Sequence, residues 1–250
     1  IGYLNCDNGL NIDQSCGFTI KNQSNSFFTE NIIWGDSFAQ HGINFVNEFE
    51  NKKFSQITHF SCIPLIDDIY ENRLNLDNDL IKKCKNFNEE NINYILNNNS
   101  IKQIVIGSRF KFLENMNEIE IKNASIAFAK KLNNISNKLH NDVDIKIFPP
   151  PPQPKYDVSS CVNRLIVHGF NRSSCNFKLS DINKLSQNQK IFINGLKKEG
   201  LNVYPLNELL CPNNICNALI GDTRVFLDDN GHLRNEASTK LGKMLKKNLQ

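Results

Sequence analysis

Short apolar runs alternate with longer segments of helical periodicity from residue 31 to the end of the chain. The apolar runs predict buried strands, which read NIIWGDS from residue 31, QITHFSC at 56–62, IKQIVIGSRF at 101–110, VDIKIFP at 143–149 and LNVYPL at 201–206. Apolar residues three and four positions apart predict helices at 38–52, about 84–96, 124–140, 187–200 and 236–249. Strands that alternate with helices at this spacing are typical of a parallel sheet covered on both faces. The chain is therefore predicted to be an α/β protein, a three-layer α/β/α sandwich around a central parallel sheet.

Two segments lie outside this pattern. Prolines concentrate in FPPPPQPKYD (148–157), which indicates a stiff, extended connection. Because strands on both sides of it are needed to complete one sheet, we interpret it as a loop within a single domain. Residues 1–30 show no alternation of strands and helices, and we predict that they form an N-terminal extension packed on a domain at 31–250.

The charge and hydropathy of the chain narrow the classes of partner. The net charge of the 250 residues is only +3 and the Lys and Arg residues are dispersed, which argues against nucleic acid as a partner. No run approaches the roughly 20 apolar residues of a membrane span. The sequence starts at Ile1 without an initiator Met or a signal peptide, so we expect a piece of a longer precursor whose other part holds a targeting or membrane segment.

Eight cysteines form four pairs of sequence neighbours: Cys6 and Cys16, Cys62 and Cys84, Cys161 and Cys175, and Cys211 and Cys216. No Cys-x-x-Cys occurs and no pair is followed by histidines at zinc-finger spacing, so no metal site is expected. Buried free thiols are one interpretation. Disulfides between sequence neighbours are the favoured one, although sequence alone does not fix the pairing. Disulfides imply an oxidising compartment such as a periplasm or the cell exterior.

The first predicted strand ends in Gly35-Asp36-Ser37, directly before a predicted helix. Ligands of open parallel sheets bind beyond the carboxyl ends of the strands, so Ser37 is a candidate nucleophile and Asp36 a structural residue that bonds the turn amides. A serine needs a base and a third group that orients the base. The segment DDNGHL places Asp229 three residues before His232, which makes this pair the candidate base and acid. The alternative is that DDNG is only a surface turn.

The blocks GDSF and DDNGHL, in this order, resemble those of the SGNH (GDSL-like) hydrolase superfamily. The resemblance covers about residues 31 to 250. It implies a flavodoxin-like sandwich in which Ser37 is the nucleophile, His232 the general base and Asp229 the orienting acid.

The chain departs from the usual pattern of that superfamily at two places. The second strand ends in HFSCIPL without the usual glycine, and the third ends in IGSRF, where Arg109 stands in place of the usual Asn. These departures, with SCIPL and the late CPNNIC, resemble SGNH domains fused behind membrane-bound acyltransferase-3 proteins, which acetylate surface polysaccharides on the outer side of the bacterial inner membrane. Both usual residues serve the oxyanion hole. In this chain the candidate donors to the oxyanion are the Ser37 N–H, a donor near Ser61, and Arg109. The alternative role for Arg109 is a surface ion pair.

The resemblance implies an extracytoplasmic O-acetyltransferase that moves an acetyl group, through a Ser37 acyl-enzyme, to a hydroxyl of a surface polysaccharide. The acetyl group would come from a transmembrane acyltransferase domain outside this sequence, with no metal or organic cofactor besides the acyl donor. An esterase that removes acyl groups from glycans or lipids would use the same three residues. A carbohydrate-binding SGNH domain without chemistry is a third possibility, which the presence of all three residues disfavours.

Overall fold

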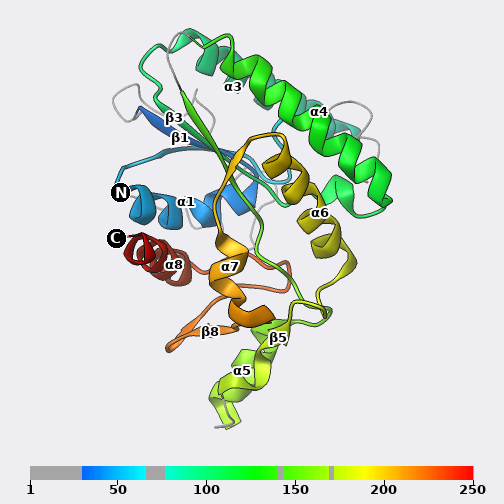
Figure 1. Ribbon diagram of the computed structural model, residues 1–250, viewed down its shortest axis with the longest axis vertical. Helices are drawn as coiled ribbons and strands as arrows, with labels where there is room; N and C mark the ends of the chain where they lie inside the picture. The colour runs from blue at the N-terminus through cyan, green and yellow to red at the C-terminus, as the bar shows by residue number, and fades with distance from the viewer. Residues whose placement is uncertain (1–29, 66–76, 140–142, 169–171, 250) are drawn as a thin grey trace.

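The structure is a computed structural model that describes residues 30–65, 77–139, 143–168 and 172–249 (Figure 1). The predicted N-terminal extension, with Cys6 and Cys16, lies outside the described residues apart from residue 30.

Five parallel strands form the central sheet in the order β2-β1-β3-β4-β6. Their bounds are β1 (Asn31–Gly35), β2 (Ser55–Thr58), β3 (Gln103–Gly107), β4 (Asp144–Phe148) and β6 (Asn202–Val203). Two small antiparallel pairs stand apart from this sheet, β5 (Phe177–Lys178) with β7 (Ile215–Cys216) and β8 (Leu219–Ile220) with β9 (Thr223–Arg224). The central parallel sheet confirms the predicted fold class.

Helices cover both faces of the sheet (Figure 1). The helices are α1 (Ser37–Glu50), α3 (Asn78–Asn97), α4 (Glu118–Ser136), α5 (Val158–His168), α6 (Lys184–Lys198), α7 (Leu206–Leu210) and α8 (Asn235–Asn248), with short 3-10 turns η3 (Lys111–Leu113), η4 (Arg172–Cys175) and η5 (Pro212–Asn214). Helices α1 and α8 pack together on one face, and α3, α4 and α6 lie on the other. Within the described ranges, no helix is both long and apolar enough to cross a bilayer.

Successive residues of β1 point into opposite layers of the core, as the two-residue period of a strand requires. Ile32 and Trp34 are buried beneath α3, α4 and α6, whereas Ile33 is buried against α1 and α8. A strand buried on both faces appears in the sequence as a continuous apolar run. This explains why the apolar run before Gly35 was enough to locate β1.

Several element boundaries differ from the predicted ones. Helix α4 begins at Glu118, ahead of the expected start at 124, because Asn117 caps it by accepting a hydrogen bond from the Glu120 amide. Helix α3 begins at Asn78, several residues before the expected start near 84, because Asp77 caps it by accepting a hydrogen bond from the Leu80 amide at 2.8 Å. Helix α5 was not predicted, since it follows the proline-rich segment directly. That segment connects β4 to α5, and its residues 149–154 are buried within the fold.

Three of the four predicted disulfides are present: Cys62–Cys84, Cys161–Cys175 and Cys211–Cys216. The pairing of sequence neighbours is confirmed for these, and the described residues include no free cysteine. Cys6–Cys16 stays a prediction because both residues lie outside the described ranges.

We expect each disulfide to stabilise the fold according to the loop that it closes. The chain-entropy relation gives about 3 kcal/mol for Cys62–Cys84 and about 2 kcal/mol for Cys211–Cys216, whose partners are 22 and 5 residues apart. Urea unfolding of the two double Cys→Ser variants measures both losses. Equal stability of both variants and the wild type would contradict the expectation, as would free thiols in the unfolded, unreduced protein.

Candidate active site

Ser37 is the first residue of α1 and lies one residue beyond Asp36, the helix N-cap. The joint between β1 and α1 is tight because Gly35 pairs with Gly107 at the end of β3. A Cβ atom on Gly35 would lie 1.8 Å from the Gly107 carbonyl oxygen and 2.8 Å from the Ala39 Cβ. Only glycine fits there, so helix α1 can begin directly at the carboxyl edge of the sheet with Ser37 on its first turn.

Ser37 and His232 are brought together from positions 195 residues apart in the sequence. The Ser37 Oγ lies 2.8 Å from His232 Nε2, and His232 Nδ1 lies 2.6 Å from Asp228 Oδ2. A carboxylate only accepts hydrogen bonds, so it holds the proton on Nδ1 and leaves Nε2 to accept the Ser37 hydroxyl proton. The three side chains therefore form one hydrogen-bonded array, the arrangement that activates a serine.

The acid of this array is Asp228, and the prediction of Asp229 was wrong. Asp228 begins a turn in which its Oδ1 accepts hydrogen bonds from the amides of Asn230 and His232, at 3.0 and 3.2 Å. Such a turn folds the first carboxylate back over the residues that follow it. Gly231, at a φ of +84°, completes the turn. Asp229 is instead exposed, and its side chain accepts a hydrogen bond from the Asn230 side chain at 3.2 Å.

The surroundings of Asp228 favour its ionised form. Burial alone would raise the pKa of Asp228, but the hydrogen bonds and charge of His232, with the Asn230 amide, lower the pKa below its ordinary value. A carboxyl whose pKa is lower in the folded than in the unfolded state stabilises the fold above its unfolded pKa. That contribution is lost as the pH falls through the folded pKa. At neutral pH the array thus retains its carboxylate.

The His232 ring packs against two neighbouring rings of α1. The Phe38 and His41 ring centroids lie 4.6 and 4.7 Å from that of His232, and His41 Nδ1 lies 3.0 Å from the Leu233 carbonyl oxygen. The His232 side chain is 13% exposed. The imidazole is therefore fixed in one orientation but keeps an edge at the cleft, as a base that exchanges protons with a substrate must.

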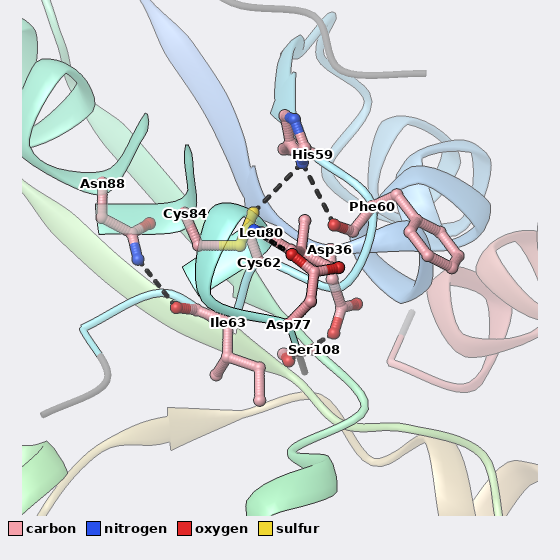
Figure 2. The surroundings of a disulfide bond; sticks show 10 residues. All are labelled: Asp36, His59, Phe60, Cys62, Ile63, Asp77, Leu80, Cys84, Asn88 and Ser108. Atoms are coloured by element: carbon pink, nitrogen blue, oxygen red, sulfur yellow. Dashed lines mark hydrogen bonds between the residues drawn. A yellow bond between two sulfur atoms is a disulfide. The ribbon is translucent and has the colours of Figure 1, made fainter. Parts of the chain in front are cut away.

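Asp36 joins the carboxyl ends of β1 and β3 beneath the array. Its side chain, with the residue only 3% exposed, accepts from the Phe38 amide at 2.8 Å, the Ser108 hydroxyl at 2.6 Å and the Arg109 amide at 2.9 Å. Figure 2 shows the Asp36 and Ser108 contact. Burial raises the pKa of Asp36, and these three donors oppose the rise. The predicted bonding of turn amides is confirmed, and the carboxyl couples the position of Ser37 to that of Arg109.

Arg109 and Ser61 line the same cleft as Ser37 and His232, a hollow of about 220 Å³. Arg109 Nη1 donates to the Asn230 side-chain oxygen at 3.0 Å, and its guanidinium carbon lies 5.9 Å from the centre of the Phe38 ring. The backbone of Ser61 is in the left-handed region, at a φ of 58°. Both residues follow the carboxyl ends of strands, as predicted, and no ion pair between Arg109 and an acidic residue occurs among the described residues.

A family model described as the SGNH domain fused to AT3 domains matches residues 5–247. The chain belongs to this family. Among solved structures, the periplasmic domain of a lipopolysaccharide acetyltransferase from Salmonella ser. Paratyphi A has the same fold, with a TM-score of 0.64 and 20% identity. The match covers 89% of this chain and 84% of that one. No curated protein matches the chain.

One cluster in this SGNH domain has the residue types of a metal site. His59, Cys62 and Cys84 place their ligand atoms within 4.8 Å of one another. Metal binding by cysteine requires thiolates, and here the two sulfur atoms are joined to each other, with His59 Nδ1 3.1 Å from the Cys62 sulfur (Figure 2). In this oxidised form the cluster does not fit a metal ion.

Sequence reasoning missed two contributors to the site of this SGNH domain. Asp228 is the first acid of DDNGH in the sequence, but the direction in which its side chain points depends on the turn. Gln189 of α6 donates its side-chain amide to the Arg109 carbonyl oxygen and so holds the loop after β3. No motif marks Gln189, because its role arises only from the packing of α6 beside that loop.

Proposed function

We propose that this SGNH domain is an extracytoplasmic O-acetyltransferase that moves an acetyl group to a hydroxyl of a surface polysaccharide through an acetylated Ser37. The observation that carries the proposal is the array of Ser37, His232 and Asp228 at the carboxyl edge of the sheet. Family membership and the similarity in fold to a periplasmic acetyltransferase domain support it. The three disulfides suit an oxidising compartment.

We infer the role of each residue from these contacts. His232 Nε2 takes the proton of the Ser37 hydroxyl while Oγ attacks the carbonyl carbon of the acetyl donor. The tetrahedral intermediate then collapses, the leaving group receives the proton from His232, and the acetyl group stays on Oγ. In the second half, His232 takes the proton of the acceptor hydroxyl, whose oxygen attacks the acetyl carbon. The bond between that carbon and the Ser37 Oγ then breaks, and His232 returns the proton to Oγ. Asp228 stabilises the imidazolium in both halves.

The oxyanion of both intermediates requires donors on the cleft side of Ser37. The Ser37 N–H is in the first turn of α1, where amides lack partners within the helix and the helix dipole favours negative charge. Arg109 adds a permanent cation and several N–H groups in the same cleft. We assign these two groups to the oxyanion, with Ser61 as a further donor from the loop after β2.

Arg109→Ala is expected to lower turnover about 100- to 1,000-fold with every acyl acceptor, water included, since each acceptor passes through the same oxyanion. The measurement compares hydrolysis of 4-nitrophenyl acetate with acetyl transfer to a saccharide. Arg164→Ala removes an exposed arginine of α5 that does not line the cleft, and serves as the matched control. Loss of transfer alone would show that Arg109 holds the acceptor, and unchanged rates in both assays would return Arg109 to a surface role.

A transferase and an esterase share the acyl-enzyme and differ in the acceptor, which is a sugar hydroxyl for the transferase and water for the esterase. We propose that the membrane acyltransferase domain to which this family is fused delivers the acetyl group. The test supplies an acetyl ester to the whole protein in membranes together with its purified surface polysaccharide, and quantifies acetylated glycan and free acetate. Acetylated glycan as the main product supports the transferase. Free acetate as the main product would identify an esterase.

A further inference from the structure

Phe60 is an exposed aromatic residue at the rim of the cleft that holds Ser37 and His232. The residue is 58% exposed, although large apolar side chains are usually buried. It lies in the turn after β2 and lines the cleft together with Ile63, Arg109 and Asn230. Its ring therefore contributes little to the core but borders the space in front of the nucleophile.

The turn that carries Phe60 is fixed at several points. The His59 amide donates to the Gly35 carbonyl oxygen at 3.1 Å and the Cys62 amide to the His59 carbonyl oxygen at 3.1 Å. The Cys62–Cys84 disulfide ties the turn to α3.

Side chains add two further restraints to this turn. Asn88 of α3 donates to the Ile63 carbonyl oxygen at 2.9 Å, and His59 Nδ1 lies 3.1 Å from the Phe60 carbonyl oxygen. Figure 2 shows the Phe60 ring pointing away from the disulfide and from these contacts. An apolar ring is thus held in place at the cleft by a rigid backbone.

We propose that Phe60 is the platform on which a sugar ring of the acceptor stacks while one hydroxyl of that sugar reaches the acetylated Ser37. The C–H face of a pyranose is apolar and weakly positive, and it complements the negative face of an aromatic ring. The remaining lining is polar at Lys111 and Asn230, which suits the hydroxyl-rich edges of the same sugar. An acetyl group is small, so most of a 220 Å³ cleft is left for the acceptor. This inference rests on the proposed function.

The experiment measures how the acetyl-enzyme divides between water and sugar. Wild-type protein receives 4-nitrophenyl acetate with methyl glycosides of glucose, galactose and rhamnose, and nitrophenol release and acetylated sugar are quantified together. Phe60→Ala is expected to lower the ratio of transfer to hydrolysis about three- to tenfold, and Phe60→Trp to restore it. Ile119→Ala, which changes a 72% exposed apolar residue at the start of α4, is the matched control and should keep the wild-type ratio.

Each outcome decides between specific alternatives. No nitrophenol release by the wild type would contradict the proposed function itself. Release without transfer to any sugar, or an unchanged ratio in Phe60→Ala, would overturn the platform alone. An equal fall in transfer and hydrolysis would show a structural role for Phe60. A loss seen only with the membrane-embedded full-length protein would assign Phe60 to contact with the partner domain instead.

Discussion

Replacing Ser37 by Ala is expected to lower the rates of acetyl transfer and ester hydrolysis about 1,000-fold or more, because the variant cannot form the acyl-enzyme. The Ser37 hydroxyl faces the cleft and contacts His232 at 2.8 Å, so its removal should leave the fold intact. Initial rates with 4-nitrophenyl acetate, with urea unfolding as the check on stability, measure both effects.

Ser100→Ala provides a control of the same chemistry for this experiment. Ser100 is exposed in the connection before β3, at the opposite edge of the sheet from the cleft. Its variant should keep wild-type rates. A Ser37→Ala protein that is folded and retains more than about a tenth of the wild-type rate would show that another group is the nucleophile.

The second large effect is expected for Asp228→Asn, and the comparison with Asp229→Asn distinguishes the two adjacent acids. Asp228→Asn keeps the shape of the side chain but can donate an N–H toward His232, so the ring loses the tautomer that accepts the Ser37 proton. The rate is expected to fall about 1,000- to 10,000-fold. Asp229→Asn makes the same chemical change one residue later, on an exposed side chain that accepts a hydrogen bond from Asn230, and should change the rate less than about twofold.

The pH profile of the wild type refines this prediction. Because the pKa of Asp228 lies below its ordinary value, the carboxylate should stay ionised as the pH falls through the range near 4 where a free Asp titrates.

Equal losses of rate in Asp228→Asn and Asp229→Asn would contradict the assignment of Asp228 as the orienting acid. A large loss in Asp229→Asn alone would restore the acid that the sequence pattern favoured.

The joint between β1 and α1 was predictable because its requirements are local. A strand buried on two faces appears as an unbroken apolar run, and Gly35, Asp36 and Ser37 follow it directly in the sequence. The need for glycine at Gly35, which comes from its close approach to Gly107 of β3, is evident only from the structure. Arg109 and Ser61 were placed correctly for a related reason. Residues that follow parallel strands meet at one edge of the sheet, whatever the distance between them in the sequence.

The orienting acid was not predictable because it depends on the direction of a side chain in a turn. Asp228 and Asp229 are chemically identical, and the spacing of the motif favoured Asp229. Only the folding of the Asp228 carboxyl over the Asn230 and His232 amides selects between them. The role of Gln189 was hidden for a different reason, since it is a tertiary contact between α6 and the loop after β3.

The mass of the protein during turnover tests most directly whether Ser37 carries the acetyl group. Rapid acid quenching of the wild type with 4-nitrophenyl acetate, followed by intact-mass measurement and peptide mapping, locates any acetyl group. We expect one acetyl group on the peptide that contains Ser37, removed when a saccharide acceptor is added before the quench and absent from Ser37→Ala. An acetyl group on a different residue, or rapid turnover with Ser37 never acetylated, would contradict the proposal that Ser37 carries the acetyl group.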